Sequence, residues 1–272
     1  MQSNLEAAVH SPHHPRRRQV LAAAAMATVW PLARAQAQTT SRPLGAVGVF
    51  ALLGDTFQLS QPADVTDTRL QRTSRDTVDL KGLGFDQAAL RAANEALNKL
   101  QPRAQVHMYR ATTPLTLAEQ RAIADGARRA ELPAWIVAAI TAKQLSHVLL
   151  VTGGRGDASF AVLGGHAVGR GTVEGIGFYL DKTTEIKNLE TGQGSVGFLG
   201  PYVMIRLQLM DVESGEVVAQ QDVRASRIAA GRRDEDATNV WNALSPTEKV
   251  DTLREMIHRN MERVLPQLLA AR

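Results

Sequence analysis

Residues 201–225 read PYVMIRLQLMDVESGEVVAQQDVRA, and this stretch decides the fold class. Apolar side chains recur at every second position from Val203 to Leu209, which is the period of a strand with one face in the core. The next segment, 211–215, has the composition of a turn, and residues 216–225 return as a second strand. The sequence therefore predicts an antiparallel hairpin late in the chain.

Upstream of this hairpin, short apolar strands alternate with amphipathic helices. Two of the strands are apolar at nearly every position, which is typical of central strands buried on both faces. Helix starts are marked by Asp86, predicted to be an N-cap, and by the capping box Thr116–Glu119. The predicted strands are residues 46–53, 104–109 and 147–152, and the predicted helices are residues 86–100, 116–130 and, after Pro133, a short helix to about residue 143.

The chain is predicted to end in a long helix. Ser245 and Glu248 form a capping box around Pro246, which suits the first helical position. Pro266 is expected to kink or end this helix. Together, these elements predict an α/β protein with a mixed sheet of about five or more strands, helices packed on the sheet, a late antiparallel hairpin and a C-terminal helix.

Glycine is concentrated in one segment, because residues 151–200 hold 13 of the 21 glycines in the chain. Such a density allows tight bends and close approach of the backbone. Strand fragments are predicted near residues 159–163 and 177–180. We therefore expect a glycine-rich β insertion at about residues 153–200.

The polar segment 60–84 contains three evenly spaced arginines, Arg69, Arg72 and Arg75. The favoured interpretation is a solvated hairpin or loop. The alternative is an anion site formed by these three side chains.

The first 37 residues have the pattern of a cleavable signal peptide. A basic cluster is followed by an apolar run, residues 20–32, and then by small residues that predict cleavage near Ala35 or Ala37. Arg17 and Arg18, with the apolar residues after them, resemble the twin-arginine export motif, and an ordinary Sec signal is the alternative. We expect a periplasmic protein whose residues 38–272 form a single domain.

Composition restricts the possible functions of the mature chain. Residues 1–37 hold four arginines and one glutamate, so their removal leaves 27 of 31 basic and 26 of 27 acidic side chains. This near-neutral balance does not favour binding to nucleic acid or to anionic lipid. The chain has no cysteine, which excludes a cysteine nucleophile, a thiolate-bound cluster and a lipidated N-terminal cysteine. We predict no cofactor and no stable membrane insertion after cleavage.

The hairpin at 201–225, with its Asp-x-x-Ser-Gly-Glu turn, and the helix and strand at 134–152 are similar to a group of cell-envelope domains. The group includes the curli-export channel subunit, the N-terminal domain of the Tol-system propeller protein and lipoproteins that activate peptidoglycan synthases. The resemblance would cover most of residues 44–270, and it implies a binding or assembly module whose partner is another envelope protein. The chain departs from the group in its glycine-rich stretch at 164–200 and in having no N-terminal cysteine.

Residues of the insertion are the candidates for partner binding. One glycine-rich bend is bracketed by four aromatic residues, Phe178, Tyr179, Phe198 and Tyr202. Aromatic side chains carry much of the energy of protein interfaces, so Phe178 and Tyr179 are candidates for an exposed contact patch. A small satellite core under the insertion is the alternative, and it is the one that the sequence favours. Arg155, Asp157 and His166 are the polar candidates, since they lie in glycine-rich bends. No metal site is predicted, because the histidines of the mature chain lack the spacing of paired ligands.

Two other functions remain open at this stage. A cofactor-free hydrolase would use Ser159 or Ser195 as nucleophile with His166 as base, and Asp157 would complete a triad with Ser159. A small-ligand carrier would hold its ligand above the strand at 147–152, beyond the carboxyl end of a central strand.

Overall fold

The longest strand, β11 (Gly194–Asp211), organises the sheet in the computed structural model. It pairs antiparallel with β12 (Val217–Ser226), which confirms the predicted late hairpin. On its other edge, β10 (Ile176–Lys187) pairs with its first half and β5 (His147–Gly153) with its second half. The structure describes residues 43–62, 73–79, 82–126, 129–162, 166–187, 194–229 and 240–272.

The main sheet has eight strands and is mixed, which confirms the predicted α/β class. β1 (Ala46–Ala51) lies between β5 and β4 (Gln105–Arg110) and is parallel to both. At the other end, β2 (Thr56–Pro62) pairs parallel with β10 and antiparallel with β3 (Thr73–Asp79). The strand order is β3-β2-β10-β11-β5-β1-β4, with β12 paired to β11 outside this path.

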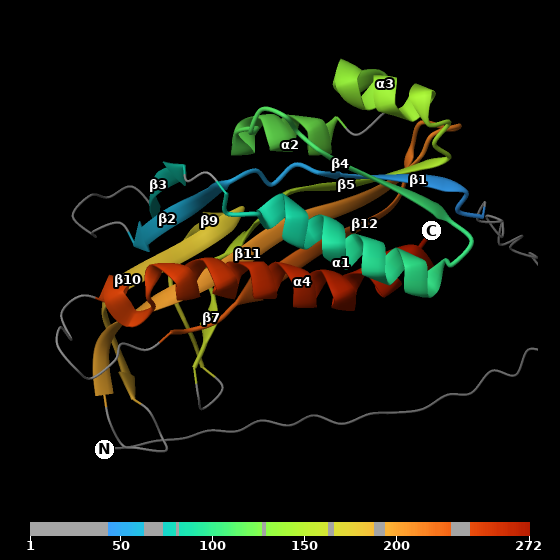
Figure 1. The fold of residues 1–272 in the computed structure, drawn as a ribbon. Helices are drawn as coiled ribbons and strands as arrows, with labels where there is room; N and C mark the ends of the chain where they lie inside the picture. The colour runs from blue at the N-terminus through green and yellow to red at the C-terminus, as the bar shows by residue number, and fades with distance from the viewer. Residues whose placement is uncertain are drawn as a thin grey trace, which may run out of the picture. The chain divides into compact units, whose positions relative to one another are not determined.

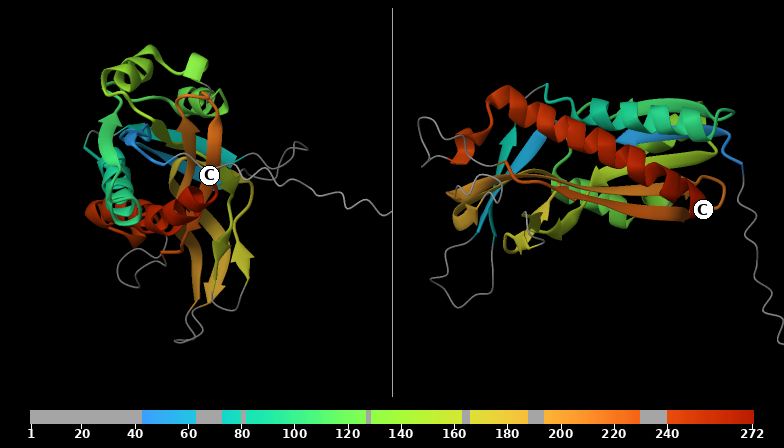
Figure 2. Two further views of the ribbon diagram at one scale, coloured as in Figure 1. Left: turned by 90° about the vertical axis from the view of Figure 1, so that its right-hand side faces the viewer. Right: turned by 90° about the horizontal axis from the view of Figure 1, so that it is seen from below.

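Helices cover both faces of the sheet (Figure 1). α1 (Phe85–Leu100) and α4 (Pro246–Ala270) pack on one face, and Figure 2 shows α4 lying along the long antiparallel strands. α2 (Leu117–Asp125) and α3 (Ala134–Ala142) pack on the other face. Single-turn 3-10 helices, Arg129–Glu131 and Val240–Ala243, precede α3 and α4.

The alternation of β1 shows how the two faces are filled. Val47, Val49 and Ala51 belong to the core under α1 and α4, whereas Phe50 belongs to the core under α2 and α3. Every one of these side chains is fully buried. The nearly unbroken apolar sequence of β1 is thus explained by burial on both faces, as expected for a central parallel strand.

Both predicted capping boxes are present. The Thr116 hydroxyl accepts from the Glu119 amide at the start of α2, and Ser245 does the same for Glu248 at the start of α4. α4 nevertheless continues to Ala270 through Pro266, so of the two outcomes expected at this proline, the end of the helix is wrong and a kink stays a prediction. The proline costs one backbone hydrogen bond, but the last turns remain helical because their apolar side chains are buried in the core: Val264, Leu265, Leu268 and Leu269.

The prediction that Asp86 caps its own helix is also wrong. The N-cap of α1 is Gly84, which has a left-handed backbone with φ of 68°. The Asp86 carboxylate instead accepts hydrogen bonds from the amides of Leu53 and Gly54, at 2.8 and 3.2 Å. It therefore caps the turn that follows β1, on a neighbouring segment of the chain.

The glycine-rich insertion is shorter than predicted and occupies residues 154–175. Its strands are β6 (Arg155–Asp157) with β9 (Thr172–Glu174) and β7 (Phe160–Ala161) with β8 (Ala167–Val168). Residues 176–187 and 194–200, which were assigned to the insertion, belong to β10 and β11 of the main sheet. The predicted fragment at 159–163 corresponds to β7, and the fragment at 177–180 lies within β10.

The insertion leaves and re-enters the sheet at adjacent points. The Gly175 amide donates to the Gly154 carbonyl at 2.9 Å, and both residues bond to Met204 of β11. Gly175 has a φ of 63°, and a side chain there would come within 2.8 Å of Leu117. We call Gly153, Gly154 and Gly175 the glycine neck. Glycine suits these positions because an added Cβ would come within 2.7 Å of Leu117 at Gly153 and within 3.1 Å of the Ile205 backbone at Gly154.

The described elements belong to one compact unit, Ser41–Arg272. Among these residues, no helix combines the length and the apolar character needed to cross a membrane. The predicted signal peptide with Arg17 and Arg18 lies outside the described residues, as do Arg69 and Arg72.

Candidate anion-binding site

Three arginines converge on one carboxylate at the base of the insertion. Glu174, at the end of β9, is only 7% exposed. Its carboxylate lies 2.9 Å from Arg121 of α2, 3.2 Å from Arg75 of β3 and 3.5 Å from Arg155 of β6. We call these four residues the arginine cluster. It joins four elements that are distant in sequence, and it fastens the insertion to the main sheet.

Two of the arginines also hold Thr172, two residues before Glu174. Arg75 donates from one nitrogen to the Thr172 carbonyl at 3.0 Å and to its hydroxyl at 2.9 Å. Arg155 donates to the same hydroxyl at 3.1 Å. The Nε of Arg75 is buried and has no hydrogen-bond partner within the described residues. The cluster thus fixes the position of these guanidinium groups while leaving part of their donor capacity unused.

The charge of the arginine cluster is unbalanced. Three guanidinium groups face one carboxylate, so the cluster has an excess of two positive charges. The Arg121 and Arg155 side chains are 50% and 61% exposed, which leaves them open to an anion from outside. Guanidinium donors are planar and match the oxygen pairs of carboxylates and phosphates. The arrangement is therefore suited to binding an anionic group.

A buried amide holds α2 next to the carboxyl end of β5. Gln120 is fully buried, donates to the Leu115 carbonyl at 3.0 Å and accepts from the Gly153 amide at 2.8 Å. It thereby positions Arg121, the next residue of α2. The cavity beside Gln120 has a volume of only about 10 Å³, which is about the space of one water molecule. This cavity is too small for an organic ligand. A separate open hollow of about 300 Å³ lies between the end of α2 and the β11–β12 hairpin, so the carrier that the sequence left open stays a prediction.

A second buried carboxylate, Asp86, lies beside the turn after β1. Burial raises the pKa of Asp86 to about 6, and the hydrogen bonds from the amides of Gly54 and Leu53 oppose this shift only in part. Near neutral pH this group is thus close to its titration range. Its side chain is 9% exposed, and it serves the turn rather than an open surface.

The sequence-predicted polar candidates separate in the structure. Arg155 lies in the arginine cluster, whereas Asp157 lies at the other end of β6, exposed and opposite Thr172. His166 is exposed next to β8. Within the described residues, neither Asp157 nor His166 makes an ion pair with the cluster. Of the three, only Arg155 is brought into a group of interacting charges.

The predicted exposed patch of Phe178 and Tyr179 is not formed. Phe178 is 1% exposed and packs in the core under α1 and α4, and Tyr179 is fully buried. Tyr179 belongs to a satellite core under the insertion, and its hydroxyl bonds to the backbone of Arg170. Both side chains are buried because each face of β10 is covered, the Phe178 face by α1 and α4 and the Tyr179 face by the insertion. The alternative of a satellite core is correct for Tyr179, which stacks with Phe160 and Phe198.

Among the described residues, Ser159, Asp157 and His166 are not assembled into a catalytic triad. Ser159 is exposed, and its carbonyl accepts from the Ser226 hydroxyl at 2.6 Å. In the described part of the chain, no hydrogen bond or ion pair joins the side chains of Ser159, Asp157 and His166. The side chain of Ser195 lies outside what the structure describes. No observation therefore favours nucleophilic catalysis by these residues.

Sequence reasoning missed Glu174 and Arg121. The sequence signal for Glu174 is its place next to the apolar Val173, and this is only a weak sign of a buried ion pair. The three arginines of the cluster lie up to 80 residues apart. They come from β3 of the main sheet, from α2 and from the separate β6–β9 pair, and only the tertiary fold brings these elements together. Of the three arginines in segment 60–84, Arg75 joins the cluster, whereas Arg69 and Arg72 lie outside the described residues. The anion site formed by all three therefore stays a prediction.

Comparisons with known proteins find distant structural similarity. No protein-family model and no curated protein matches the sequence. Among solved structures, protein XCC0632 of Xanthomonas campestris, with the family label DUF330, has a TM-score of 0.34 at 5% identity and covers 84% of this chain and 85% of its own. A putative neuraminyllactose-binding hemagglutinin homolog from Helicobacter pylori has a TM-score of 0.32 at 9% identity, with 84% of each chain covered.

The hypothetical protein CT253 of Chlamydia trachomatis has a TM-score of 0.33 at 8% identity and covers 84% of this chain and 99% of its own. None of the three has a name from the group of envelope domains that the sequence resembles, so that resemblance stays a prediction. At these TM-scores, no property of the three proteins is transferred to this chain.

Proposed function

We propose that this protein is a non-catalytic binding module of the bacterial cell envelope that holds an acidic side chain of a partner protein at the arginine cluster. The observation that carries the proposal is the convergence of Arg75, Arg121 and Arg155 on the single carboxylate of Glu174. A cluster built only to neutralise Glu174 would need one cation. The excess of two leaves a site for a second anion.

The exposure of the cluster favours a macromolecular partner over a small ligand. Arg121 and Arg155 lie at the surface, and the adjoining cavity of about 10 Å³ encloses no organic ligand. A partner that contacts Arg121 and Arg155 must therefore dock on the protein surface, because within the described residues no enclosed pocket leads to them. Desolvation on docking strengthens such charge pairs, because the effective dielectric constant falls. An aspartate or glutamate on a complementary protein surface satisfies these conditions.

The proposed location rests on the N-terminal sequence. The basic, apolar and small-residue order of residues 1–37 supports export, and the pair Arg17-Arg18 supports the twin-arginine route, which carries folded proteins. Without this segment, the chain has almost no net charge. A general electrostatic attraction to membranes or nucleic acids is therefore not part of the proposal, and the partner is another envelope protein.

Crosslinked capture from periplasm tests the binding site. The baits are residues 38–272, the double variant Arg121→Gln/Arg155→Gln, and a control, Arg91→Gln/Arg103→Gln, which removes the same charge at two other exposed positions. We expect the first and third baits to capture the same protein and the cluster variant to capture at least tenfold less. Equal capture by all three baits contradicts the proposed site.

Replacement of the arginine pair tests the export route. Arg17→Lys/Arg18→Lys keeps the positive charge that a Sec signal needs but removes the twin arginines. We expect the variant to stay in the cytoplasm, as measured by fractionation. Unchanged export of the variant shows that the Sec alternative is correct, whereas cytoplasmic retention of the unaltered protein contradicts export altogether.

A further inference from the structure

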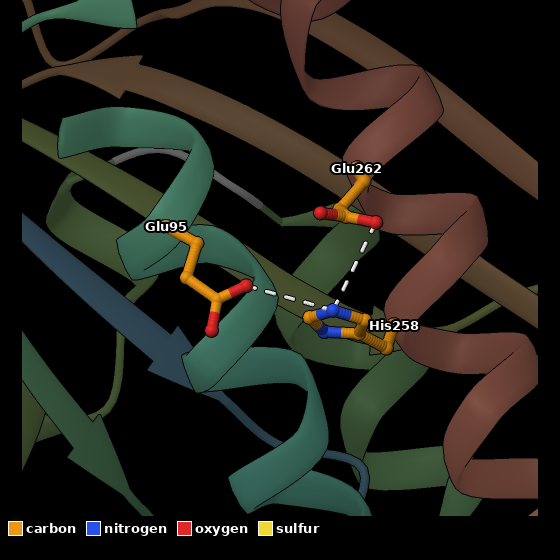
Figure 3. A group of neighbouring side chains, drawn as sticks. All are labelled: Glu95, His258 and Glu262. Atoms are coloured by element: carbon orange, nitrogen blue, oxygen red, sulfur yellow. Dashed lines mark ion pairs between the residues drawn. The ribbon is translucent and has the colours of Figure 1, made fainter. Parts of the chain in front are cut away.

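Three potential metal ligands meet between α1 and α4, on the sheet face opposite α2. Figure 3 shows Glu95 of α1 pointing toward His258 and Glu262 of α4. The His258 Nε2 lies 3.5 Å from the Glu95 carboxylate and 3.8 Å from that of Glu262. The ligand atoms of all three side chains lie within 4.8 Å of one another. We propose that these three residues bind a Zn²⁺ ion that links the two helices.

Helix geometry explains why the side chains converge. His258 and Glu262 are four residues apart in α4, so they lie on the same side of the helix, one turn apart. α1 packs against α4 over the shared core, and Glu95 approaches from the facing helix. Two ligands from one helix and a third from its neighbour form a site on two rigid elements, which a metal ion can occupy without a change of the backbone.

The separations fit shared coordination better than hydrogen bonding. N–H···O hydrogen bonds span about 2.7–3.2 Å, and both distances here are longer. Zinc bonds of about 2.0–2.2 Å in a tetrahedral arrangement place a nitrogen and an oxygen ligand about 3.3–3.5 Å apart. The distance between His258 and Glu95 lies at the upper end of this range, and that between His258 and Glu262 is a few tenths of an ångström longer.

The charges also favour a cation. Among the described residues, neither Glu95 nor Glu262 forms an ion pair with a lysine or arginine. On the same helix, Glu255 is directly paired with Arg259 at 2.6 Å. Two carboxylates thus converge on one imidazole with no permanent positive charge between them. A divalent ion compensates both charges and accepts the imidazole nitrogen as a third ligand.

The ligand set selects the kind of ion. One imidazole and two carboxylates suit Zn²⁺ and its neighbours in the first transition row, whereas Mg²⁺ prefers oxygen ligands and keeps several waters. The side chains are 31% exposed for His258 and 50% for each glutamate, so ions can enter from solvent. A fourth position stays open to water. The site is independent of the arginine cluster and of the proposed partner.

Titration calorimetry with Zn²⁺ and with Mg²⁺ tests this site on the purified protein. We expect Zn²⁺ but not Mg²⁺ to bind and to raise the midpoint of thermal unfolding in proportion to the logarithm of its concentration. His258→Ala should abolish this binding, and Glu95→Gln should weaken it at least tenfold. Glu255→Gln, a change at a paired glutamate on the same helix, should leave it unchanged.

All the proteins in this assay are residues 38–272, the predicted mature chain, which lacks the N-terminal histidines His10, His13 and His14. The difference between the unaltered protein and His258→Ala therefore reports the proposed site alone. Equal Zn²⁺ affinity in these two proteins overturns the proposal. Loss of binding in His258→Ala without any weakening in Glu95→Gln also overturns it, because an ion held by α4 alone does not link the helices. Circular dichroism of each variant verifies that the fold is retained.

Discussion

Two buried carboxylates, at the base of the insertion and at the start of α1, are stabilised in different ways. Glu174 faces three guanidinium groups, whereas Asp86 receives two backbone hydrogen bonds and has no cation in contact among the described residues. Burial raises the pKa of Asp86 to about 6. The comparison teaches that backbone amides alone are enough to hold the buried carboxylate of Asp86 beside a turn. The three arginines around Glu174 instead leave an excess of positive charge at the surface.

The largest expected effect comes from removing the anion of the cluster. Glu174→Gln leaves Arg75, Arg121 and Arg155 facing one another without a carboxylate. Breaking a buried ion pair on one side costs about 3–5 kcal/mol, and the partial exposure of Arg121 and Arg155 places this variant near 3 kcal/mol. Urea unfolding measures the loss. Glu185→Gln, at an exposed position, is the control, and a loss below about 1 kcal/mol would show that the cluster does not stabilise the insertion.

A somewhat smaller effect is expected from pH at Asp86. Its pKa lies at about 6 in the folded protein and at 3.8 without the environment of the fold. The folded state therefore binds more protons between these values, and stability falls as pH rises from about 4 to about 6. The difference corresponds to about 2–3 kcal/mol. In Asp86→Asn this contribution is absent, because the amide does not titrate.

Unfolding of both proteins at several pH values between 4 and 7 tests this prediction. The curve of stability against pH should be flatter for Asp86→Asn than for the unaltered protein over this interval. The amide oxygen of asparagine can still accept both bonds that one carboxylate oxygen of Asp86 accepts. Parallel curves would mean that Asp86 does not titrate in this window.

The smallest effects should rank the individual arginines by exposure. Arg75 is 29% exposed and makes two hydrogen bonds to Thr172, so Arg75→Gln should cost about 1–2 kcal/mol. Arg155 is 61% exposed, and Arg155→Gln should cost less than about 0.5 kcal/mol. Thermal unfolding of the two variants measures the difference. A larger loss of stability in Arg155→Gln than in Arg75→Gln would mean that burial does not determine how much each arginine contributes.

The main sheet was predictable from the sequence because its signals are local. The alternation from Val203 to Leu209 and the capping boxes at Thr116 and Ser245 each depend on a few consecutive residues. The assignment of Asp86 failed for a related reason. A carboxylate at a helix start has the same local sequence whether it caps its own helix or a neighbouring turn.

The candidate site was predictable only in part because it depends on tertiary contacts. Arg155 and Arg75 were noticed as basic residues, but their common partner, Glu174, follows from the pairing of β6 with β9 and from the packing of this pair against β3. The burial of Phe178 likewise follows from the helices that cover its face of β10. Neither arrangement has a signature in the residues themselves.

The glycine neck has a consequence for how this protein can change during evolution. The chain leaves the sheet at Gly154 and returns at Gly175, which is hydrogen-bonded to Gly154, so the segment between them is a loop whose two ends are in contact. Its length can vary without shifting the register of β5, β10 or β11, because loop closure costs little when the ends already meet. The neck is thus a position at which related chains can carry insertions of different lengths, provided that each insertion still covers the satellite core on β10 and β11.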